Sequence, residues 1–370
     1  MLYDELKEYS AGWVYPMHMP GHKRNPEFMP SGLPYDIDIT EIRGFDDLHE
    51  PRGVLLETAE LASKLYGSDK AFLLVNGSTV GILAAIGALA PPGGKILVTR
   101  NCHRSVDNAA ALFGLSPVCL PLATDEASGV HCSVDPSAVK SALSKDPGIG
   151  LVVVTSPSYE GVVSDIGAIA GVAHEHGVPL LVDGAHGAHL GFSARFPESP
   201  VRAGADVVVM SLHKTLPALT QCSLLHVCTE RANAAEIKRL LSVLQTSSPS
   251  YVLMASTDHC LRLMASEKER LFSQYEKNLE RFREQLKPLK RLNILGGKTG
   301  FFALDPGKIV IVTRSTALSG FELADILREE HKVELELACA DYAIAMTSIC
   351  DSVEGFDRLA AALLCIDNGS

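Results

Sequence analysis

The stretch Ser211-Leu212-His213-Lys214-Thr215-Leu216-Pro217 is the segment from which the fold can be worked out. It follows the apolar run 205–210, which predicts a buried strand. A lysine directly after such a strand lies at its carboxyl end, where open α/β sheets bind their ligands. A desolvated lysine amine loses its proton easily and can then form a Schiff base with an aldehyde. A surface lysine after a core strand is the alternative that this stretch alone leaves open.

An acidic residue upstream supplies a partner for Lys214. The segment Val178-Pro179-Leu180-Leu181-Val182-Asp183-Gly184-Ala185-His186-Gly187 predicts a second buried strand that ends in an acid. A carboxylate and a lysine at nearby strand ends suit pyridoxal phosphate, because the acid can keep the pyridine nitrogen protonated while the lysine holds the aldehyde carbon. A helix N-cap is the alternative role for Asp183.

Composition restricts the class of protein and its partners. The chain has 370 residues, of which 46% are hydrophobic, so it can form a large core and a smaller second lobe. Its net charge of −11 and the absence of a basic run argue against nucleic acid as a partner. The nine cysteines show neither a CxxC pair nor zinc spacing, so neither a disulfide framework nor a metal site is expected. Free thiols predict the cytoplasm.

No segment predicts contact with a membrane. Residues 1–8 are acidic and lack the apolar stretch of a signal peptide. The longest apolar run, residues 80–90, is too short to cross a bilayer.

We divide the chain into four parts. Residues 1–50 are predicted to form an N-terminal arm, because Pro and Gly interrupt the segment Met19-Pro20-Gly21-His22-Lys23-Arg24-Asn25-Pro26. Such an arm needs a surface to lie on, and a second subunit is one candidate. Residues 51–250 are predicted to be the cofactor-binding large domain. A helical stretch over 251–287 would link it to a small α+β domain, residues 288–370.

The large domain is expected to be α/β. Its predicted strands alternate with helices, which indicates a mostly parallel sheet covered on both faces. The strands are expected over residues 71–75, 95–99, 118–122, 151–155, 178–183, 205–210 and 220–227. In the small domain, strands are expected over 292–295, 308–312, 333–337 and 342–347, and helices over 320–331 and 354–364.

Polar residues follow other predicted strands. Gly77, Ser78 and Thr79 open a helix expected over 82–89, and backbone N–H groups there would suit a phosphate. An ordinary Ser/Thr cap is the alternative. His103 also follows a strand, and its ring could stack on a flat cofactor, cap a helix or face solvent. The hydroxyls of residues 247–250 could serve a phosphate or cap the next helix.

Taken together, these stretches resemble the Orn/Lys/Arg decarboxylase family, whose members have PLP fold type I. The likeness covers nearly the whole chain and is closest to the shorter branch from Gram-positive bacteria. Seven motifs carry it: Met19-Pro20-Gly21-His22-Lys23, Asp46-Asp47-Leu48-His49, Leu74-Val75-Asn76-Gly77-Ser78-Thr79, Arg100-Asn101-Cys102-His103, residues 157–165, Val182-Asp183-Gly184-Ala185-His186-Gly187-Ala188-His189 and residues 211–221.

The resemblance implies a role for each candidate residue. Lys214 looks like the lysine that forms the Schiff base, and Asp183 like the partner of the pyridine nitrogen. His103 and Ala185 would lie against the two faces of the ring, and His186 beside its phenolic oxygen. Five residues would form the phosphate cradle: Gly77, Ser78, Thr79, Ser211 and His213. The resemblance implies a fold type I architecture with a seven-stranded sheet.

The implied reaction is α-decarboxylation of arginine, lysine or ornithine, a lyase step of polyamine metabolism. Segment 346–350 lacks the arginine with which most fold type I aminotransferases hold an α-carboxylate. A homodimer with a shared active site is expected. The distal group of a basic substrate needs an acidic partner, and four acids are candidates: Glu160, Glu334, Glu336 and Asp341.

Two alternatives stay open. One is another fold type I reaction, by an aminotransferase or a β-eliminating lyase. The other is a non-catalytic relative, because typical family members continue into a further C-terminal domain.

Overall fold

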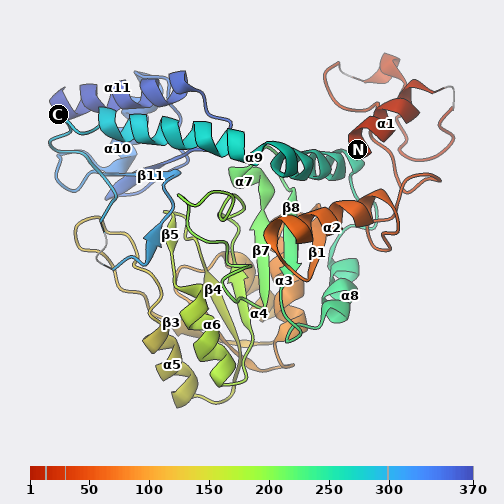
Figure 1. The fold of residues 1–370 in the computed structure, drawn as a ribbon, viewed down its shortest axis with the longest axis horizontal. Helices are drawn as coiled ribbons and strands as arrows, with labels where there is room; N and C mark the ends of the chain where they lie inside the picture. The colour runs from red at the N-terminus through yellow and green to blue at the C-terminus, as the bar shows by residue number, and fades with distance from the viewer. Residues whose placement is uncertain (13–14, 30, 298–299, 370) are drawn as a thin grey trace.

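A seven-stranded sheet lies at the centre of the molecule (Figure 1). The computed structural model describes residues 1–12, 15–29, 31–297 and 300–369. The strand order is β1-β8-β7-β6-β4-β2-β3, in which β8 is antiparallel to both neighbours and the other pairs are parallel. The predicted mostly parallel sheet is therefore confirmed. Its strands are β1 (Lys70–Leu74), β2 (Lys95–Thr99), β3 (Ser116–Leu120), β4 (Ile149–Thr155), β6 (Leu180–Asp183), β7 (Val207–Ser211) and β8 (Ser223–Val227).

Helices cover both faces of this sheet, as parallel strands require. Successive side chains of a strand point to opposite faces, so in β4 Val152 and Val154 join one apolar cluster while Leu151 and Val153 join the other. The second cluster includes α3 (Gly77–Leu89), α4 (Arg104–Leu112) and α8 (Ala234–Leu244). The first includes α2 (Val54–Tyr66), α5 (Pro136–Lys145), α6 (Ile166–Glu175) and α9 (Tyr251–Gln285).

The long helix α9 connects the N-terminal arm, the large sheet and the C-terminal part of the chain (Figure 1). Its fully buried Asp258 accepts hydrogen bonds from the backbone N–H of Leu2 at 3.0 Å and from the hydroxyl of Thr58 at 2.9 Å. Arg262, one turn further along α9, donates to the same carboxylate. Because a buried carboxylate needs such donors, Asp258 ties the arm and α2 to α9.

The C-terminal part forms its own antiparallel sheet, in the order β12-β13-β11-β9. Its strands are β9 (Asn293–Ile294), β11 (Lys308–Val312), β12 (Leu337–Ala338) and β13 (Tyr342–Met346). The helices α10 (Gly320–Glu329) and α11 (Val353–Gly369) pack on it. This matches the expected α+β composition of that region, whereas the four-part division of the chain stays a prediction.

A two-stranded ribbon connects the segment that follows β4 of the large sheet with the segment that precedes β11 of the second sheet. In it, β5 (Val162–Val163), which follows the loop after β4, pairs with β10 (Ala303–Leu304). The backbone N–H of Asp305 also donates to the carbonyl of Gly161, at 2.8 Å. The chain segment that leads into β11 is therefore held against the loop that follows β4.

Several elements differ from the sequence prediction. The strand expected over 333–337 forms only at its end, as β12, because residues 333–336 make just one backbone bond toward β13 before pairing begins. The helix expected from residue 82 begins at Gly77. The four-residue α7 (Leu212–Thr215) was not foreseen, and neither were α8 and α1 (Leu2–Ala11), whose buried Leu2 and Leu6 pack against α9. Both α8 and α1 are short amphipathic helices whose apolar faces become evident only from their packing.

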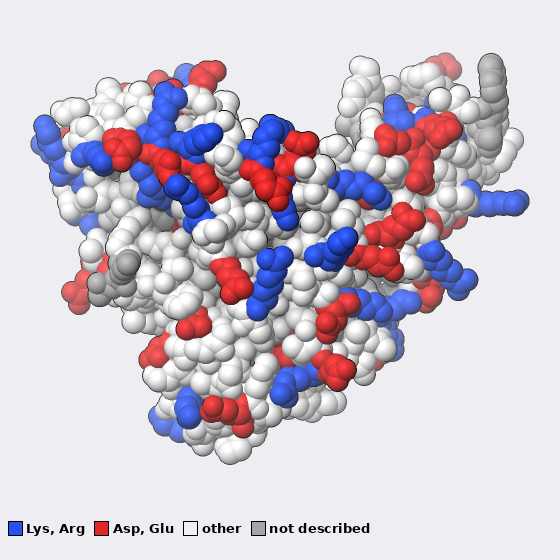
Figure 2. Space-filling model, viewed as in Figure 1, with Lys and Arg blue, Asp and Glu red and all other residues white. Residues whose placement is uncertain are grey.

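The surface carries no strong single-sign field on the face shown in Figure 2, where acidic and basic side chains are interspersed. Within the described parts of the chain, no helix combines the length and apolar character needed to traverse a bilayer.

Candidate active site

Polar groups gather where the parallel strands of the large sheet end. Thr155 ends β4 and is paired in register with Asp183, which ends β6. Asp183 is in turn paired with Val209 of β7, two residues before the strand ends at Ser211. This carboxyl edge is where doubly wound sheets bind ligands.

Lys214 projects from the short helix α7 (Leu212–Thr215), directly after β7. Its Nζ lies 3.1 Å from Nε2 of His186. Burial lowers the pKa of the Lys214 ammonium below its ordinary value, although the negative charges of Asp183 and Glu336 oppose the shift. A partly desolvated amine of this kind is suited to nucleophilic attack on an aldehyde.

Asp183 is almost completely buried, and its carboxylate accepts a hydrogen bond from the N–H of Ala185 at 3.1 Å. Burial raises the pKa of this carboxyl, because the charged form loses its hydration. The nearby Lys214 and His103 act in the opposite direction. The alternative that Asp183 caps a helix is wrong, since residues 184–206 form turns and bends, without a helix.

His103 occupies the N-cap position of α4. Its Nδ1 accepts the N–H of Ser105 at 3.2 Å and lies 2.8 Å from the Ser105 hydroxyl. The capping alternative is therefore realised. The imidazole is exposed, and it lies close enough to act on two neighbours: it opposes the rise in the pKa of Asp183 and adds to the lowering of the pKa of His186. Stacking of its ring on a cofactor stays a prediction.

The residues of the predicted phosphate cradle converge at the N-terminus of α3. Gly77 has φ +71°, which glycine tolerates well, and its N–H donates to the carbonyl of Gln221 in the loop after α7. Ser78 and Thr79 lie in the first turn, so neither is the N-cap. That position belongs to Asn76, whose side chain makes no capping bond and accepts the N–H of Thr246 instead. Within the part of the chain that the structure describes, the N-cap residue thus gives the first N–H groups of α3 no side-chain cap.

The remaining cradle candidates follow β7. Nδ1 of His213 donates to the carbonyl of Cys222 at 3.0 Å, and burial lowers the pKa of the ring. Ser211 is fully buried at the N-cap of α7. In the 247–250 loop, Ser250 caps α9 by accepting the N–H of Leu253, so for this hydroxyl the capping alternative holds.

Several hydroxyls and amides at this edge of the sheet are buried without hydrogen-bond partners among the described residues, a situation that folded proteins generally avoid. They belong to residues at or just after the ends of β2, β4 and β7, namely Asn101, Thr155, Ser211 and Thr215. Together with the buried carboxyl of Asp183, this donor and acceptor set fits a polar, phosphorylated ring such as pyridoxal phosphate.

Lys308 was not among the predicted site residues, yet it reaches the same place from the second sheet. It opens β11, is buried, and its Nζ lies 3.0 Å from Nδ1 of His186. The ring of Tyr159 lies 4.5 Å from the His186 ring. The only signal for Lys308 in the sequence is a lysine placed at the start of an otherwise apolar strand, which is weak evidence by itself.

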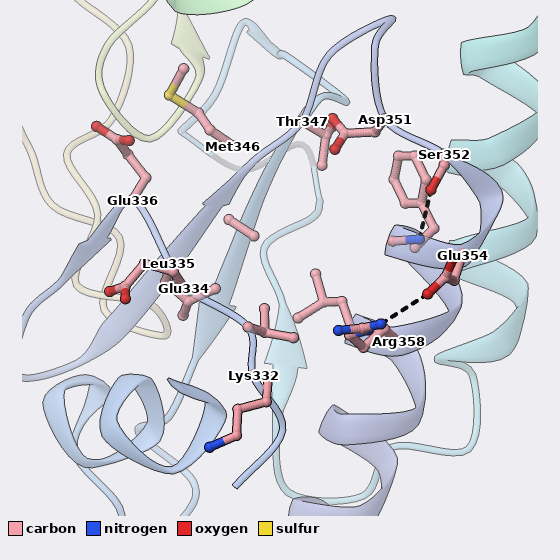
Figure 3. Close-up of a pocket in the computed structure, with 15 residues that line it drawn as sticks. Lys332, Glu334, Leu335, Glu336, Met346, Thr347, Asp351, Ser352, Glu354 and Arg358 are labelled. Atoms are coloured by element: carbon pink, nitrogen blue, oxygen red, sulfur yellow. Dashed lines mark hydrogen bonds and ion pairs between the residues drawn. The ribbon is translucent and has the colours of Figure 1, made fainter. Parts of the chain in front are cut away.

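The four acidic candidates separate into two pairs. Glu334 and Asp341 form exposed ion pairs with Arg328 and Arg314. Glu160 and Glu336 face the site region. Glu160 accepts hydrogen bonds from the hydroxyls of Ser158 and Tyr342, and Glu336 accepts one from Tyr159. Figure 3 shows Glu336 at one edge of a hollow of about 540 Å³, far from α11 on its other side.

The sheet, its strand-end lysine and acid, and the attached α+β unit define the class of PLP-dependent enzymes of fold type I. The chain aligns over 99% of its length with the lysine decarboxylase LdcF of Francisella novicida, with a TM-score of 0.83 and 20% identity. It spans 60% of the length of that structure.

Sequence comparison specifies the family. The model for "Orn/Lys/Arg decarboxylase, major domain" matches residues 1–299. Over 98% of the chain and 76% of the relative, the sequence is 32% identical to an arginine decarboxylase of Bacillus subtilis. It is 39% identical to the uncharacterized protein YaaO of the same organism, over 91% of the chain and 71% of that protein. The chain therefore belongs to the Orn/Lys/Arg decarboxylase family, whose members are PLP-dependent amino acid decarboxylases.

Proposed function

We propose that this protein removes the α-carboxylate of a basic amino acid as CO₂ and releases the corresponding amine. The observation that carries the proposal is the meeting of Lys214, Asp183 and His103 at one edge of the sheet, beside buried hydroxyls that lack partners in the described chain. Family membership supports the reaction class. The absence of arginine from segment 346–350 further favours loss of the carboxylate over its retention, as a transaminase requires.

The proposed roles follow from the positions of the side chains. Bound pyridoxal phosphate would supply an electron sink for the electron pair left by CO₂. The carboxylate of Asp183 would hold the proton on the pyridine nitrogen. Lys214 Nζ would hold the cofactor and be displaced from it by the substrate amine. The amine of Lys214 or a neighbouring imidazole would then return a proton to Cα.

The cofactor would be held by groups from four segments. We propose that His103 and Ala185 lie against the two faces of its ring, and that His186 lies beside the phenolic oxygen. The phosphate would be bound by the cradle defined by the sequence: Gly77, Ser78, Thr79, Ser211 and His213. Support comes from the first turn of α3 and from the Ser211 hydroxyl, because among the described residues no side chain caps the former or bonds the latter.

Arginine is the first substrate to test. The relative with 32% identity is an arginine decarboxylase, whereas the likeness to lysine decarboxylase LdcF is at 20% identity. Turnover of arginine, lysine and ornithine should be measured in parallel, by following both CO₂ and the amine product. Amine from one of them supports the proposal. A protein that binds pyridoxal phosphate but yields no amine from any of the three would contradict it.

Glu336 and Glu160 are proposed to bind the distal cationic group of the substrate. Replacing Glu336 with glutamine should raise KM for the preferred amino acid about tenfold with little change in kcat, since a hydrogen bond to a charged group is worth roughly 1.5 kcal/mol. Glu334→Gln is the matched control, because Glu334 lies two residues away but pairs with Arg328 on the surface. Equal KM values for the two variants would assign the distal group to another residue.

We also propose a homodimer with a shared site. The arm projects from the body beside α9 (Figure 1). An apolar hollow of about 490 Å³ between them is lined by Ile37 and Val252 and by the exposed Tyr3 and Leu219. Leu219 lies close in sequence to Lys214, so a partner covering this surface would border the site. Light scattering at micromolar concentration should give twice the chain mass, and a monomer would contradict this.

A further inference from the structure

Three nitrogen bases form a continuous chain between the two sheets. Lys308 Nζ lies 3.0 Å from His186 Nδ1, and His186 Nε2 lies 3.1 Å from Lys214 Nζ. Lys308 is 5% exposed and His186 is 6% exposed, so the contact between them is shielded from bulk water, and Lys214 is partly buried. A histidine thus separates the candidate nucleophile from a second, buried lysine.

The position of Lys308 is fixed by its surroundings. The β5–β10 ribbon holds the chain just before it, and Gly161 in the loop before β5 leaves room for its aliphatic stem. A Cβ at Gly161 would lie 2.7 Å from Cβ and Cγ of Lys308. On the other side, Thr347 donates two hydrogen bonds to the carbonyl of Gly307, the residue before Lys308. Lys308 therefore has little freedom to leave His186.

Hydrogen-bond chemistry limits the protonation states that Lys308, His186 and Lys214 can have together. A neutral imidazole has one N–H donor and one acceptor nitrogen, so it accepts from one neighbour and donates to the other. An ammonium can only donate, and hence the lysine that receives the imidazole N–H must be a neutral amine. Burial and the two lysines lower the pKa of His186 well below its ordinary value, which keeps the ring neutral. One of the two lysines must therefore lack its charge.

More acids act on Lys308 than on Lys214. Asp305 lies beside Lys308, and the carboxylates of Glu336 and Glu160 also favour its charged form. The Tyr159 ring lies 5.8 Å from the ammonium, within the range of a cation–π contact. Burial nevertheless lowers the pKa of Lys308 to about 8, which leaves it mostly protonated at neutral pH. Fewer acids act on Lys214: Asp183, whose own carboxyl has a raised pKa, and Glu336, which also acts on Lys308.

We propose that Lys308 is a positioning residue that donates to Nδ1 of His186, fixes the proton on Nε2, and so makes His186 donate to a neutral Lys214 amine. This inference rests on the proposed role of Lys214 as the residue that captures the cofactor. The lone pair of the neutral amine forms the new C–N bond to the aldehyde carbon. The aldehyde oxygen then leaves as water with the two amine hydrogens, so the step needs no redox partner.

The hydrogen-bonded chain Lys308–His186–Lys214 has other titratable neighbours, and these affect the pH at which its members gain or lose protons. Asp305 pairs with His189 at 3.0 Å, and the pair is buried. The groups that act on Lys308, His186 or Lys214 from the packed elements are Asp183, His103, His189, Asp305, Glu160, Glu336 and Tyr159. A single variant can shift their titration as well, so the test uses a double-mutant comparison.

The test measures how readily Lys214 of the cofactor-free protein reacts with aldehydes between about pH 6 and 10. This range ends just below the ordinary pKa of a lysine. One readout is the rate of Schiff-base formation with added pyridoxal phosphate. The other is reductive methylation of Lys214 by formaldehyde, located by mass spectrometry. In Lys308→Met, both reactions should be about tenfold slower at pH 7, and their midpoint should move up by about one pH unit. Lys140→Met, which removes a surface charge, should change neither.

The double variant separates the proposed chain from a general charge effect. His186→Phe should give the same shift, and adding Lys308→Met to it should have no further effect, because the two residues act in series. Lys308→Arg keeps a donor and should restore part of the rate. Additive effects, or an unchanged midpoint in Lys308→Met, would overturn the inference.

Two further outcomes are informative. If Lys308→Met does not fold, ¹⁵N NMR of the native protein still reports the tautomer of His186, and a proton on Nδ1 would overturn the inference. If the native protein fails to capture pyridoxal phosphate on Lys214, the proposed function fails. The formaldehyde reaction would then still test whether Lys308 controls the state of the Lys214 amine.

Discussion

Replacing Lys214 with alanine is expected to reduce amine formation by about 10⁴-fold or more, the scale of loss when a covalent nucleophile is removed. Lys214 is the partly buried amine at the carboxyl end of β7, in contact with His186. The alanine variant should also lose the yellow colour of a protein-bound Schiff base. Borohydride reduction of the native holoprotein, followed by peptide mass analysis, should place the cofactor on Lys214.

Lys95→Ala is the matched control for this experiment. Lys95 begins β2 at the opposite, amino edge of the sheet and pairs with Asp146 on the surface. It should keep both colour and turnover. Native rates in Lys214→Ala, or a reduced adduct on another lysine, would contradict the role of Lys214.

Asp183→Asn is expected to lower kcat by about 10²- to 10³-fold, the usual cost of removing a group that stabilises charge in a reaction. Asparagine is nearly isosteric but cannot hold a proton on the pyridine nitrogen through a negative charge. The affinity for pyridoxal phosphate should fall as well. Absorption spectra at increasing cofactor concentration and steady-state kinetics measure the two effects separately.

The same substitution should stabilise the cofactor-free protein at neutral pH. Burial raises the pKa of the Asp183 carboxyl in the folded state above the unfolded value of about 4, so native stability falls as pH rises through that interval. The neutral asparagine side chain would carry no such cost, and the gain should disappear in acid, where the aspartic acid is protonated in both states. Melting temperatures of both proteins against pH provide the measurement. Asp165→Asn, which keeps the cap of α6, is the control and should behave as the native protein.

The large sheet could be predicted because its strands are continuous apolar runs that end in recognisable turns. Val207 to Met210 are all buried, as the apolar run indicates. The prediction failed where local signals are weak. Ribbon β5–β10 pairs two-residue strands far apart in sequence, and β12 is defined by its partner β13, so neither leaves a periodic pattern.

The candidate site divides in the same way. Asp183 ends one predicted strand and Lys214 follows shortly after another, so parallel topology alone brings them to one edge. Lys308 and Tyr159 approach His186 from other segments, and only the tertiary packing of the second sheet brings them there. Sequence reasoning offered four acids for a distal cation without ranking them. The structure separates Glu160 and Glu336, which face the site region, from the two that form surface ion pairs.

Under the role proposed for Lys308, the protonation state of the Lys214 amine would depend on the β5–β10 ribbon. Lys308 lies four residues after β10, so any swing of the C-terminal unit away from the large sheet would strain this ribbon and draw the lysine from His186. In such an open form Lys214 would revert toward an ordinary, protonated amine. Packing of the C-terminal unit against the large sheet would thus be the step that makes the Lys214 amine neutral and reactive.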